Sequence, residues 1–166
     1  MTTTDSGTRY DEAVIEADPR VPMVHITRDF RATPQQLMRA HTDPELFVRW
    51  IGPDGMTTRI DIWEPRTLGA YRYVSSDGNG EYAFRGTFPD VGETHIVQTF
   101  CWEGMPEAIA LERIWFEDLG DGRTRMHSWS LCESFESRDG MLASGMEVGV
   151  QQGYAKLDRL LADGEV

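Results

Sequence analysis

Residues 56–134 constrain the fold more than any other part of the chain, because strand-like segments alternate there with turn signals. Most of the turns contain glycine or proline, and DGNG is a strong hairpin signal. Consecutive strands joined by short turns pair with one another, so this stretch predicts an antiparallel meander. Its six strands are expected within TTRIDIWEP, GAYRYVSS, EYAFRGTF, THIVQTFCWEG, AIALERIWFED and TRMHSWSLCES.

A seventh strand and two short helices are expected before the meander. The segment VPMVHITRDFRA has the alternation of a strand. Thr33 precedes Pro34, which predicts an N-cap followed by a first-turn proline. Asp43 and the proline after it begin a second short helix, which ends at Gly52 and the proline that follows.

The last expected element is a long helix over residues 138–161, and it has a role in closing the fold. A twisted sheet with exposed edges curls, and this helix is the only element large enough to fill the concave side. The predicted class is α+β, with a curved seven-stranded antiparallel sheet around the C-terminal helix and two short helices after strand 1. Separate sheet and helix layers with a solid core remain the alternative.

Length and composition predict one domain. The chain has 166 residues, enough for a single core. Residues 1–20 are polar and acidic, so they are expected to form a tail that contributes little to the core. Residues 21–166 are expected to form the domain.

Charge and hydropathy exclude several classes of partner. The formal net charge of −12 disfavours a nucleic-acid backbone or an anionic membrane as the main partner. The sequence contains no run of eighteen apolar residues, so insertion into a membrane is not expected. The N-terminus lacks the basic start and apolar run of a secretory signal, so a cytoplasmic protein is expected.

The cysteine and histidine pattern predicts neither a metal site nor a cofactor. Cys101 and Cys132 lie in predicted strands and are expected to be free thiols. The chain has no C-x-x-C spacing and no H-E-x-x-H pattern.

The final helix carries glycines beside its apolar stripe. At 100° per residue, the stripe contains Leu142, Met146, Val150, Leu157, Leu160 and Leu161. Gly149 and Gly153 lie within or beside it, although an interior glycine costs about 1 kcal/mol of helix stability. Either the glycines let the helix backbone press against a neighbour, or they leave room for a ligand. Both interpretations remain open.

Polar residues share the presumed inward parity of the strands. Arg28, Gln98 and Glu112 alternate in phase with large apolar side chains, which favours a ligand cavity over a dry core. Alternatively, Arg28 and Glu112 lie near strand ends or pair with each other. The predicted cavity residues are Arg28, Trp50, Tyr71, Tyr73, Phe84, Gln98, Phe100, Trp102, Glu112, Met146, Gly149 and Gly153. Trp115, His127 and Trp129 have the opposite parity and predict an exposed patch, with a homodimer as one possible use.

Several segments resemble a known family. They are ITRDFRATPQQLMRAHTDPELFVRWIGPDG, YAFRGTF, QTFCWEGMPEA, FEDLGDGRTR and ESRDGMLASGMEVGVQQGYAKLDRLLA. Over about residues 21–163 the chain resembles bacterial activator of 90-kDa heat shock protein ATPase homologues of the START-like SRPBCC superfamily. The resemblance implies a helix-grip fold with a deep, largely apolar cavity.

The sequence departs from that family pattern at four places. Leu68 stands where the first of two glycines is usual, and Cys101 where glutamate is common. Trp129 and Cys132 also replace other residues. These departures affect the expected cavity lining rather than the fold.

Three functions are compatible with the sequence. The first is non-catalytic binding or carriage of a small hydrophobic molecule. The second is a protein-interaction module that resembles a chaperone ATPase activator. The third is a polyketide cyclase- or hydrolase-like enzyme that uses Glu112 or His127 as acid or base. Because no nucleophile–base pair is visible, no catalytic residue is assigned.

Overall fold

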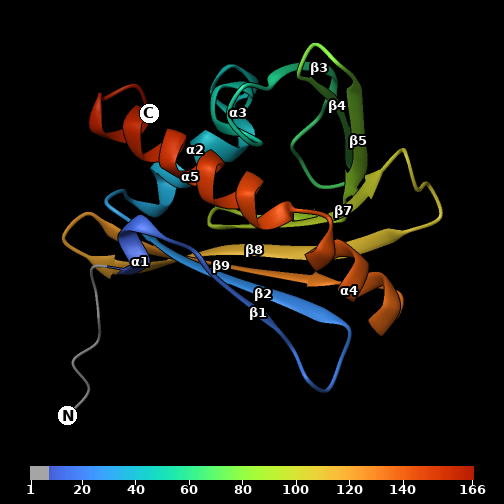
Figure 1. The fold of residues 1–166 in the computed structure, drawn as a ribbon. Coiled ribbons are helices and arrows are strands. Elements are labelled where there is room, and N and C mark those ends of the chain that lie inside the picture. Colours follow the sequence, from blue (N-terminus) through green and yellow to red (C-terminus); the bar gives the residue numbers. More distant parts are fainter. Residues whose placement is uncertain (1–7) are drawn as a thin grey trace.

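The computed structural model describes residues 8–166, which form one antiparallel sheet and five helices. The sheet has the order β1-β2-β9-β8-β7-β5-β4-β3, and β6 pairs with β7 (Figure 1). The strands are β1 (Val14–Ala17), β2 (Met23–Phe30), β3 (Thr57–Trp63), β4 (Gly69–Ser76), β5 (Glu81–Phe88), β6 (Asp90–Val91), β7 (His95–Trp102), β8 (Ile109–Gly120) and β9 (Arg123–Leu131). The helices are α1 (Thr8–Asp11), α2 (Pro34–Thr42), α3 (Pro44–Trp50), α4 (Phe135–Ala143) and α5 (Met146–Ala162).

The structure confirms the predicted α+β class and the curved antiparallel sheet. The seven predicted strands correspond to β2, β3, β4, β5, β7, β8 and β9, and the short strands β1 and β6 are additional. The two predicted short helices are α2 and α3. Thr33 caps α2 in a reciprocal capping box with Gln36, and Asp43 caps α3 by accepting from the backbone N–H of Glu45.

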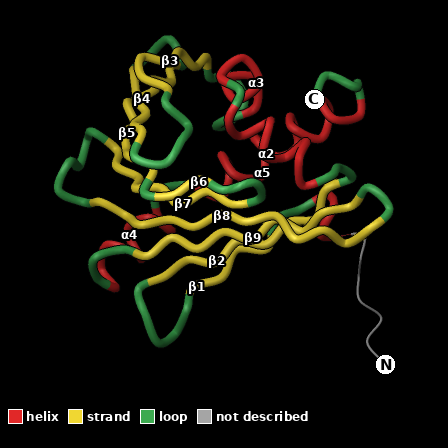
Figure 2. Tube along the Cα trace, turned by 180° about the vertical axis from the view of Figure 1, so that it is seen from behind, coloured by secondary structure: helices red, strands yellow, loops and turns green. Residues whose placement is uncertain are grey.

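The sheet bends sharply between β5 and β7. Only two residue pairs join these strands, whereas eight pairs join β4 to β5. Gly86 lies at the bend, where a Cβ atom would collide with the carbonyl oxygen of Thr99. The strands β3, β4 and β5 consequently stand away from the layer formed by the other long strands, as Figures 1 and 2 show from opposite sides.

The expectation of an N-terminal tail is wrong for residues 8–20, and residues 1–7 lie outside the described part. Strand β1 extends the sheet by pairing antiparallel with β2, from Val14 opposite Thr27 to Ala17 opposite Val24. Ala13 is 5% exposed and belongs to the core. Both its backbone polar groups bond to the side-chain amide of Gln151, at 2.8 and 2.9 Å.

Deleting residues 1–20 should therefore destabilise the protein. The deletion removes β1 and leaves β2 as an unpaired edge. We expect a loss of about 2 kcal/mol, or roughly 4–8 °C in thermal midpoint for a domain of this size. Calorimetry of the full chain and the deletion variant measures this, with Gln151→Ala expected to give part of the same loss. An unchanged midpoint in the deletion variant would contradict the role assigned to β1.

The C-terminal segment forms two helices rather than the single predicted one. Gly145 has φ +86°, a left-handed conformation that glycine adopts without a steric penalty, and it separates α4 from α5. The buried Arg138 anchors α4 by donating hydrogen bonds to the carbonyl oxygens of Asp18 (2.8 Å) and Met23 (3.2 Å). As a result, only α5 lies along the concave side of the sheet (Figure 1).

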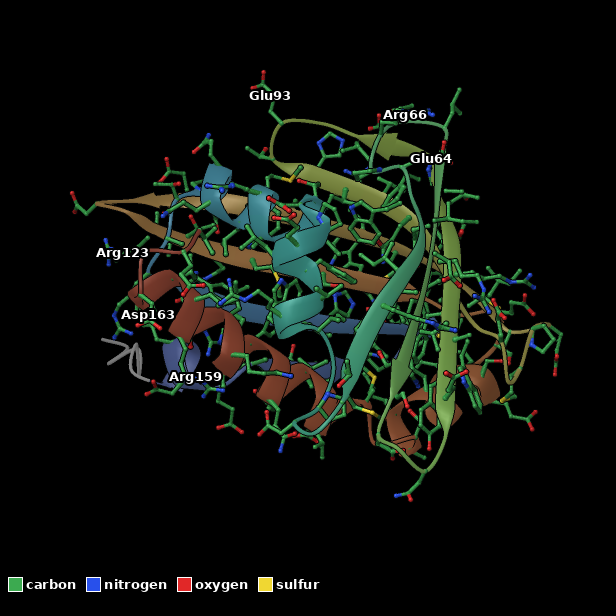
Figure 3. The ribbon with its side chains drawn as sticks, turned by 90° about the horizontal axis from the view of Figure 1, so that it is seen from above. Glu64, Arg66, Glu93, Arg123, Arg159 and Asp163 are labelled. Carbon is green, nitrogen blue, oxygen red and sulfur yellow. The ribbon has the colours of Figure 1, made fainter. Side chains whose placement is uncertain are left out.

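Helix α5 packs against α3, and its residues Tyr154 and Asp158 contact Phe30 and Arg28 of β2. Helices α2 and α3 lie over the sheet beside α5, as Figure 3 shows from above. Leu157 is fully buried and Leu160 is 8% exposed. The indole N–H of Trp50 donates to the carbonyl oxygen of Ala40 at 2.9 Å, so this large side chain is buried with its polar group satisfied. These contacts fix the orientation of α5 above the sheet.

Candidate ligand site on the concave face

A row of polar side chains crosses the concave face at the middle of the sheet. Gln98 of β7 lies opposite Glu112 of β8, which lies opposite Ser130 of β9. The amide of Gln98 donates to Glu112 Oε1 at 2.9 Å, and the Ser130 hydroxyl donates to Oε2. The shared strand parity places these three polar groups side by side, and they form one hydrogen-bonded network. The sequence predicted the inward position of Gln98 and Glu112 but not their hydrogen bonds.

The carboxyl of Glu112 lacks a charged partner within residues 8–166. Burial raises the pKa of Glu112, and the hydrogen bonds from Ser130 and Gln98 oppose this effect. Both donors are neutral. Glu112 as a whole residue is half-buried, while its carboxyl is enclosed enough for burial to dominate the shift of its pKa.

Arg28 pairs with Asp158, not with Glu112. The guanidinium of Arg28, a residue 1% exposed on β2, donates to both carboxylate oxygens of Asp158 on α5 at 2.7 and 2.6 Å. The guanidinium also lies over the ring of Phe30, 4.6 Å from its centroid. The possible pairing of Arg28 with Glu112 is therefore contradicted, because α5 supplies the neutralising carboxylate.

An aromatic wall runs along the concave face from β4 to β7. The ring of Tyr73 stacks with Tyr71 at 6.1 Å and with Phe84 at 5.3 Å. Phe84 in turn stacks with Phe100 at 5.5 Å. Tyr71 and Tyr73 are 3% and 7% exposed, whereas Phe84 and Phe100 are half-buried. Four predicted cavity residues thus form one continuous aromatic surface.

Glu112 lies within electrostatic range of this wall. Burial raises the pKa of Tyr71 and Tyr73, and the charge of Glu112 adds to the increase for both. The Tyr71 hydroxyl donates to the carbonyl oxygen of Thr99 at 2.7 Å. The polar row and the aromatic wall therefore belong to one site.

Tyr154 was missed in the sequence and faces the sheet from α5. Its ring stacks on Trp50 at 5.7 Å and meets the edge of Phe30 at 5.4 Å. Burial raises its pKa, with a further increase from Glu112 and an opposing effect from Arg28. Tyr154 thus lies within electrostatic range of both Glu112 and Arg28. One feature of the sequence could have indicated this role: on the helical wheel, Tyr154 lies about 20° beyond the apolar stripe.

The two helix glycines face α3 and the loop after it instead of open space. A Cβ atom at Gly153 would lie 2.9 Å from the carbonyl oxygen of Trp50, and one at Gly149 would lie 3.5 Å from Pro53 Cδ. The cavity role predicted for these glycines is therefore wrong, and the close-contact interpretation holds for Gly153. Trp50 itself is 4% exposed, in the core beneath Tyr154.

Two other predicted cavity residues lie away from the polar row. Trp102 is 40% exposed at the end of β7. Met146 lies at the start of α5 and borders a groove against β1. The groove is lined by Glu12, Ala13, Val14, Ile15, Leu142, Met146 and Glu147. The residues that the structure gathers on the concave face are therefore Tyr71, Tyr73, Phe84, Gln98, Phe100 and Glu112, with Arg28 at one side.

His41 is a buried neutral group near this site. Burial lowers the pKa of His41 to about 4, and its hydrogen bond to the Leu37 carbonyl oxygen opposes the shift. Because its pKa in the folded state is depressed, His41 contributes stability that is present above pH 6.5. This stability is lost as pH falls toward 4.

We expect the unfolding free energy of the parent to fall by about 1 kcal/mol more than that of His41→Leu between pH 7 and 5.5. Denaturant unfolding at both pH values measures the difference. The raised pKa of Glu112 changes stability in the opposite direction, because its contribution to stability is lost as pH rises. Glu112 is present in both proteins, so the comparison with the variant removes its contribution. Parallel pH profiles of parent and variant would contradict the buried neutral state of His41.

The convex face carries the predicted aromatic patch. Trp115 stacks with His127 at 4.8 Å and meets Trp129 edge-on at 5.0 Å. Trp129 is 42% exposed. A shallow groove there is lined by Thr94, His95, Arg113, Trp115 and Trp129. The patch is therefore exposed, as the sequence predicted.

Other classes of site have no support within the described residues. No group of three histidine, cysteine, aspartate or glutamate side chains in residues 8–166 is arranged to hold a metal ion. None of the helices in that range has the length and apolar character needed to cross a membrane. Cys101 and Cys132 are buried free cysteines, as expected.

The curved sheet around a C-terminal helix places the protein in the helix-grip class. The chain belongs to the Activator of Hsp90 ATPase homolog 1-like protein family, whose model matches residues 31–162. This confirms the resemblance found in the sequence. A search of curated protein sequences found no match.

Solved structures from bacteria have the same fold. Protein Ms6760 from Mycobacterium smegmatis is 20% identical, with a TM-score of 0.80 over 90% of this chain and 96% of its own. A Rhodobacter sphaeroides protein is 23% identical, with a TM-score of 0.80 and coverage of 90% and 98%. An Arthrobacter aurescens protein is 22% identical, with a TM-score of 0.81 and coverage of 90% and 91%. At these identities the similarity establishes the fold alone.

Proposed function

We propose that this protein binds a small hydrophobic molecule, without catalysis, between the concave face of the sheet and α5. The main support is that the aromatic wall and the polar row lie at the centre of the fold, yet Phe84, Phe100, Gln98 and Glu112 are not fully buried. A dry core packs such rings to exclude solvent. Apolar walls with a few polar groups are typical of small-molecule sites.

Catalysis by the two candidate acid–base residues is not favoured. Glu112 faces α5, whereas His127 lies on the opposite face of the sheet, where it stacks on Trp115 and pairs with Glu117 at 3.1 Å. The two groups therefore cannot act on one substrate. The family and fold fit a ligand-binding or interaction module better than a cyclase.

A fluorescent probe tests the proposed site. N-phenyl-1-naphthylamine is expected to bind the parent, and Phe84→Ala should weaken binding about 10-fold, equivalent to about 1.4 kcal/mol, by interrupting the aromatic wall. Trp129→Ala is the matched control, since it removes an aromatic ring from the convex face and should leave the affinity unchanged. Equal affinities for parent and Phe84→Ala, or a loss only in Trp129→Ala, would contradict the concave site.

The convex face supports a second candidate function as a protein-interaction module. Apolar side chains are exposed there on neighbouring strands: Leu111 and Ile109 of β8 are 47% and 46% exposed, and Leu131 of β9 is 36% exposed. Leu111 lies opposite Leu131, beside the Trp129 patch. Exposed apolar patches of this kind mark interaction surfaces. Sedimentation velocity of parent and Leu111→Asp tests whether this face joins two copies.

A further inference from the structure

We propose that the molecule bound on the concave face is a hydrophobic amine whose protonated nitrogen pairs with Glu112. This inference rests on the proposed function and specifies the chemical class of its ligand. Three features support it: an unpaired interior carboxyl group, an aromatic surface around that group, and two tyrosine hydroxyls that are available as hydrogen-bond acceptors.

The carboxyl group has hydrogen bonds but no counter-charge. Gln98 contributes a neutral amide donor at 2.9 Å and Ser130 a neutral hydroxyl. Arg28 is a cation on the same face, but both of its terminal nitrogens are bonded to Asp158. A carboxylate in a protein interior is costly unless a cation or several donors compensate for it. A ligand ammonium group would supply the missing positive charge.

The surrounding rings suit a cation with a hydrocarbon body. Tyr73, Phe84 and Phe100 stack along one side of the site. Tyr154 of α5, which stacks on Trp50, lies within electrostatic range of Glu112. Ring faces attract an ammonium group through their quadrupole, and the same rings bury apolar surface. Aromatic residues that surround a cation are a known mode of amine recognition.

Two hydroxyls are available to accept the ammonium hydrogens. The Tyr71 hydroxyl is bonded to the carbonyl oxygen of Thr99. The Tyr73 and Tyr154 hydroxyls make no hydrogen bond within residues 8–166 and are not among the fully buried atoms that lack a partner. Both tyrosines lie within electrostatic range of Glu112. An anionic ligand would meet the like charge of Glu112, so fatty acids and other carboxylates are disfavoured.

Three naphthalene probes of similar size test the charge preference. They are 1-naphthylmethylamine, which is protonated at pH 7, 1-naphthalenemethanol, which is neutral, and 1-naphthoate, which is an anion. Displacement of N-phenyl-1-naphthylamine from the full chain gives their relative affinities. The amine is expected to bind at least 10-fold more tightly than the alcohol, and the naphthoate more weakly than either.

The variant Glu112→Gln isolates the charge. The change keeps the size of the side chain. Its amide oxygen can accept the hydrogen bond from Gln98, and its NH2 group can donate to the Ser130 hydroxyl oxygen. Amine affinity should fall to that of the alcohol, while alcohol affinity changes less than about twofold. Glu117→Gln is the matched control, because Glu117 lies on the same strand but faces away from the site, and it should alter neither affinity.

The pH profile provides a second readout. The titratable groups within electrostatic range of Glu112 are Tyr71 and Tyr73 of β4, Tyr154 of α5 and Cys132 after β9. Tyr154 is also within range of Arg28, which pairs with Asp158. The pKa values of the three tyrosines and the cysteine are raised, so none of these groups gains charge below neutral pH. Amine binding should weaken as acidification protonates Glu112, while alcohol binding stays constant.

The outcomes separate this inference from the proposed function. If the alcohol binds as tightly as the amine, or if Glu112→Gln keeps the preference for the amine, the inference is overturned while hydrophobic binding stands. If neither the naphthalene probes nor N-phenyl-1-naphthylamine bind, the proposed function fails and the inference fails with it. A charge preference that is lost only in Glu112→Gln supports both.

Discussion

Asp158→Ala is expected to lower the free energy of unfolding by about 3–5 kcal/mol, the usual cost of removing one partner from a buried ion pair. The Asp158 side chain is 37% exposed, but its partner Arg28 is almost fully enclosed. The variant would leave that guanidinium without a neutralising charge. Urea denaturation followed by tryptophan fluorescence measures the loss.

Two companion variants identify the cause. Asp163→Ala removes an exposed carboxylate just beyond the end of α5, visible at the periphery in Figure 3, and should change stability by less than about 0.5 kcal/mol. The double variant Arg28→Met with Asp158→Leu should recover most of the lost stability, because apolar replacement of a buried pair is often neutral. A loss below 1 kcal/mol in Asp158→Ala would show that the pair does not join α5 to β2 as described.

Gly153→Leu should destabilise the protein by about 3 kcal/mol or more, at or above the upper end of overpacking effects. A Cβ atom at Gly153 already reaches within 2.9 Å of the Trp50 carbonyl oxygen, and that backbone ends α3. The larger side chain must therefore separate the two helices. Gly153→Ala is expected to cost about 1–3 kcal/mol for the same reason.

Gly149 provides the matched comparison on the same helix. Its Cβ atom would meet Pro53 Cδ at 3.5 Å, an ordinary van der Waals contact. Gly149→Ala should therefore gain up to about 1 kcal/mol of helix propensity. Denaturant unfolding of both alanine variants gives the contrast. Equal effects at the two positions would mean that α5 does not approach α3 closely at Gly153.

The strands and their inward faces could be predicted because strand geometry repeats every two residues. Once Phe100 was assigned to the inner face, Gln98 followed, and Glu112 followed from Phe116 in the same way. The structure places both polar residues in one cross-strand row. Their hydrogen bonds could not be predicted, since these depend on the register between strands.

The helix side of the site was less predictable because α5 contacts two partners. Its apolar stripe covers α3 as well as the sheet, so the centre of the stripe does not point at the site. Gly153 therefore faces α3, while Tyr154 and Asp158 face the sheet. Asp158 lay on the polar side of the helical wheel, and only the buried Arg28 on β2 explains its position.

Two further differences have local causes. Strand β1 was missed because this segment contributes little to the core beyond Ala13, just before the strand, and Ile15 within it, and acidic residues surround both. The break before α5 was missed because Gly145 lies at the margin of an otherwise continuous apolar stripe. A single glycine in a helical pattern does not reveal whether its backbone is left-handed.

The central claim is that a small hydrophobic molecule binds between the concave face and α5. Isotope-filtered NOE spectroscopy of the labelled protein with N-phenyl-1-naphthylamine tests it most directly, because the NOEs report which rings touch the bound probe. The proposal predicts one bound molecule with NOEs to the ring protons of Tyr73, Phe84 and Tyr154. NOEs confined to Trp115 and Trp129 on the convex face, or no intermolecular NOE at saturating probe, would contradict it.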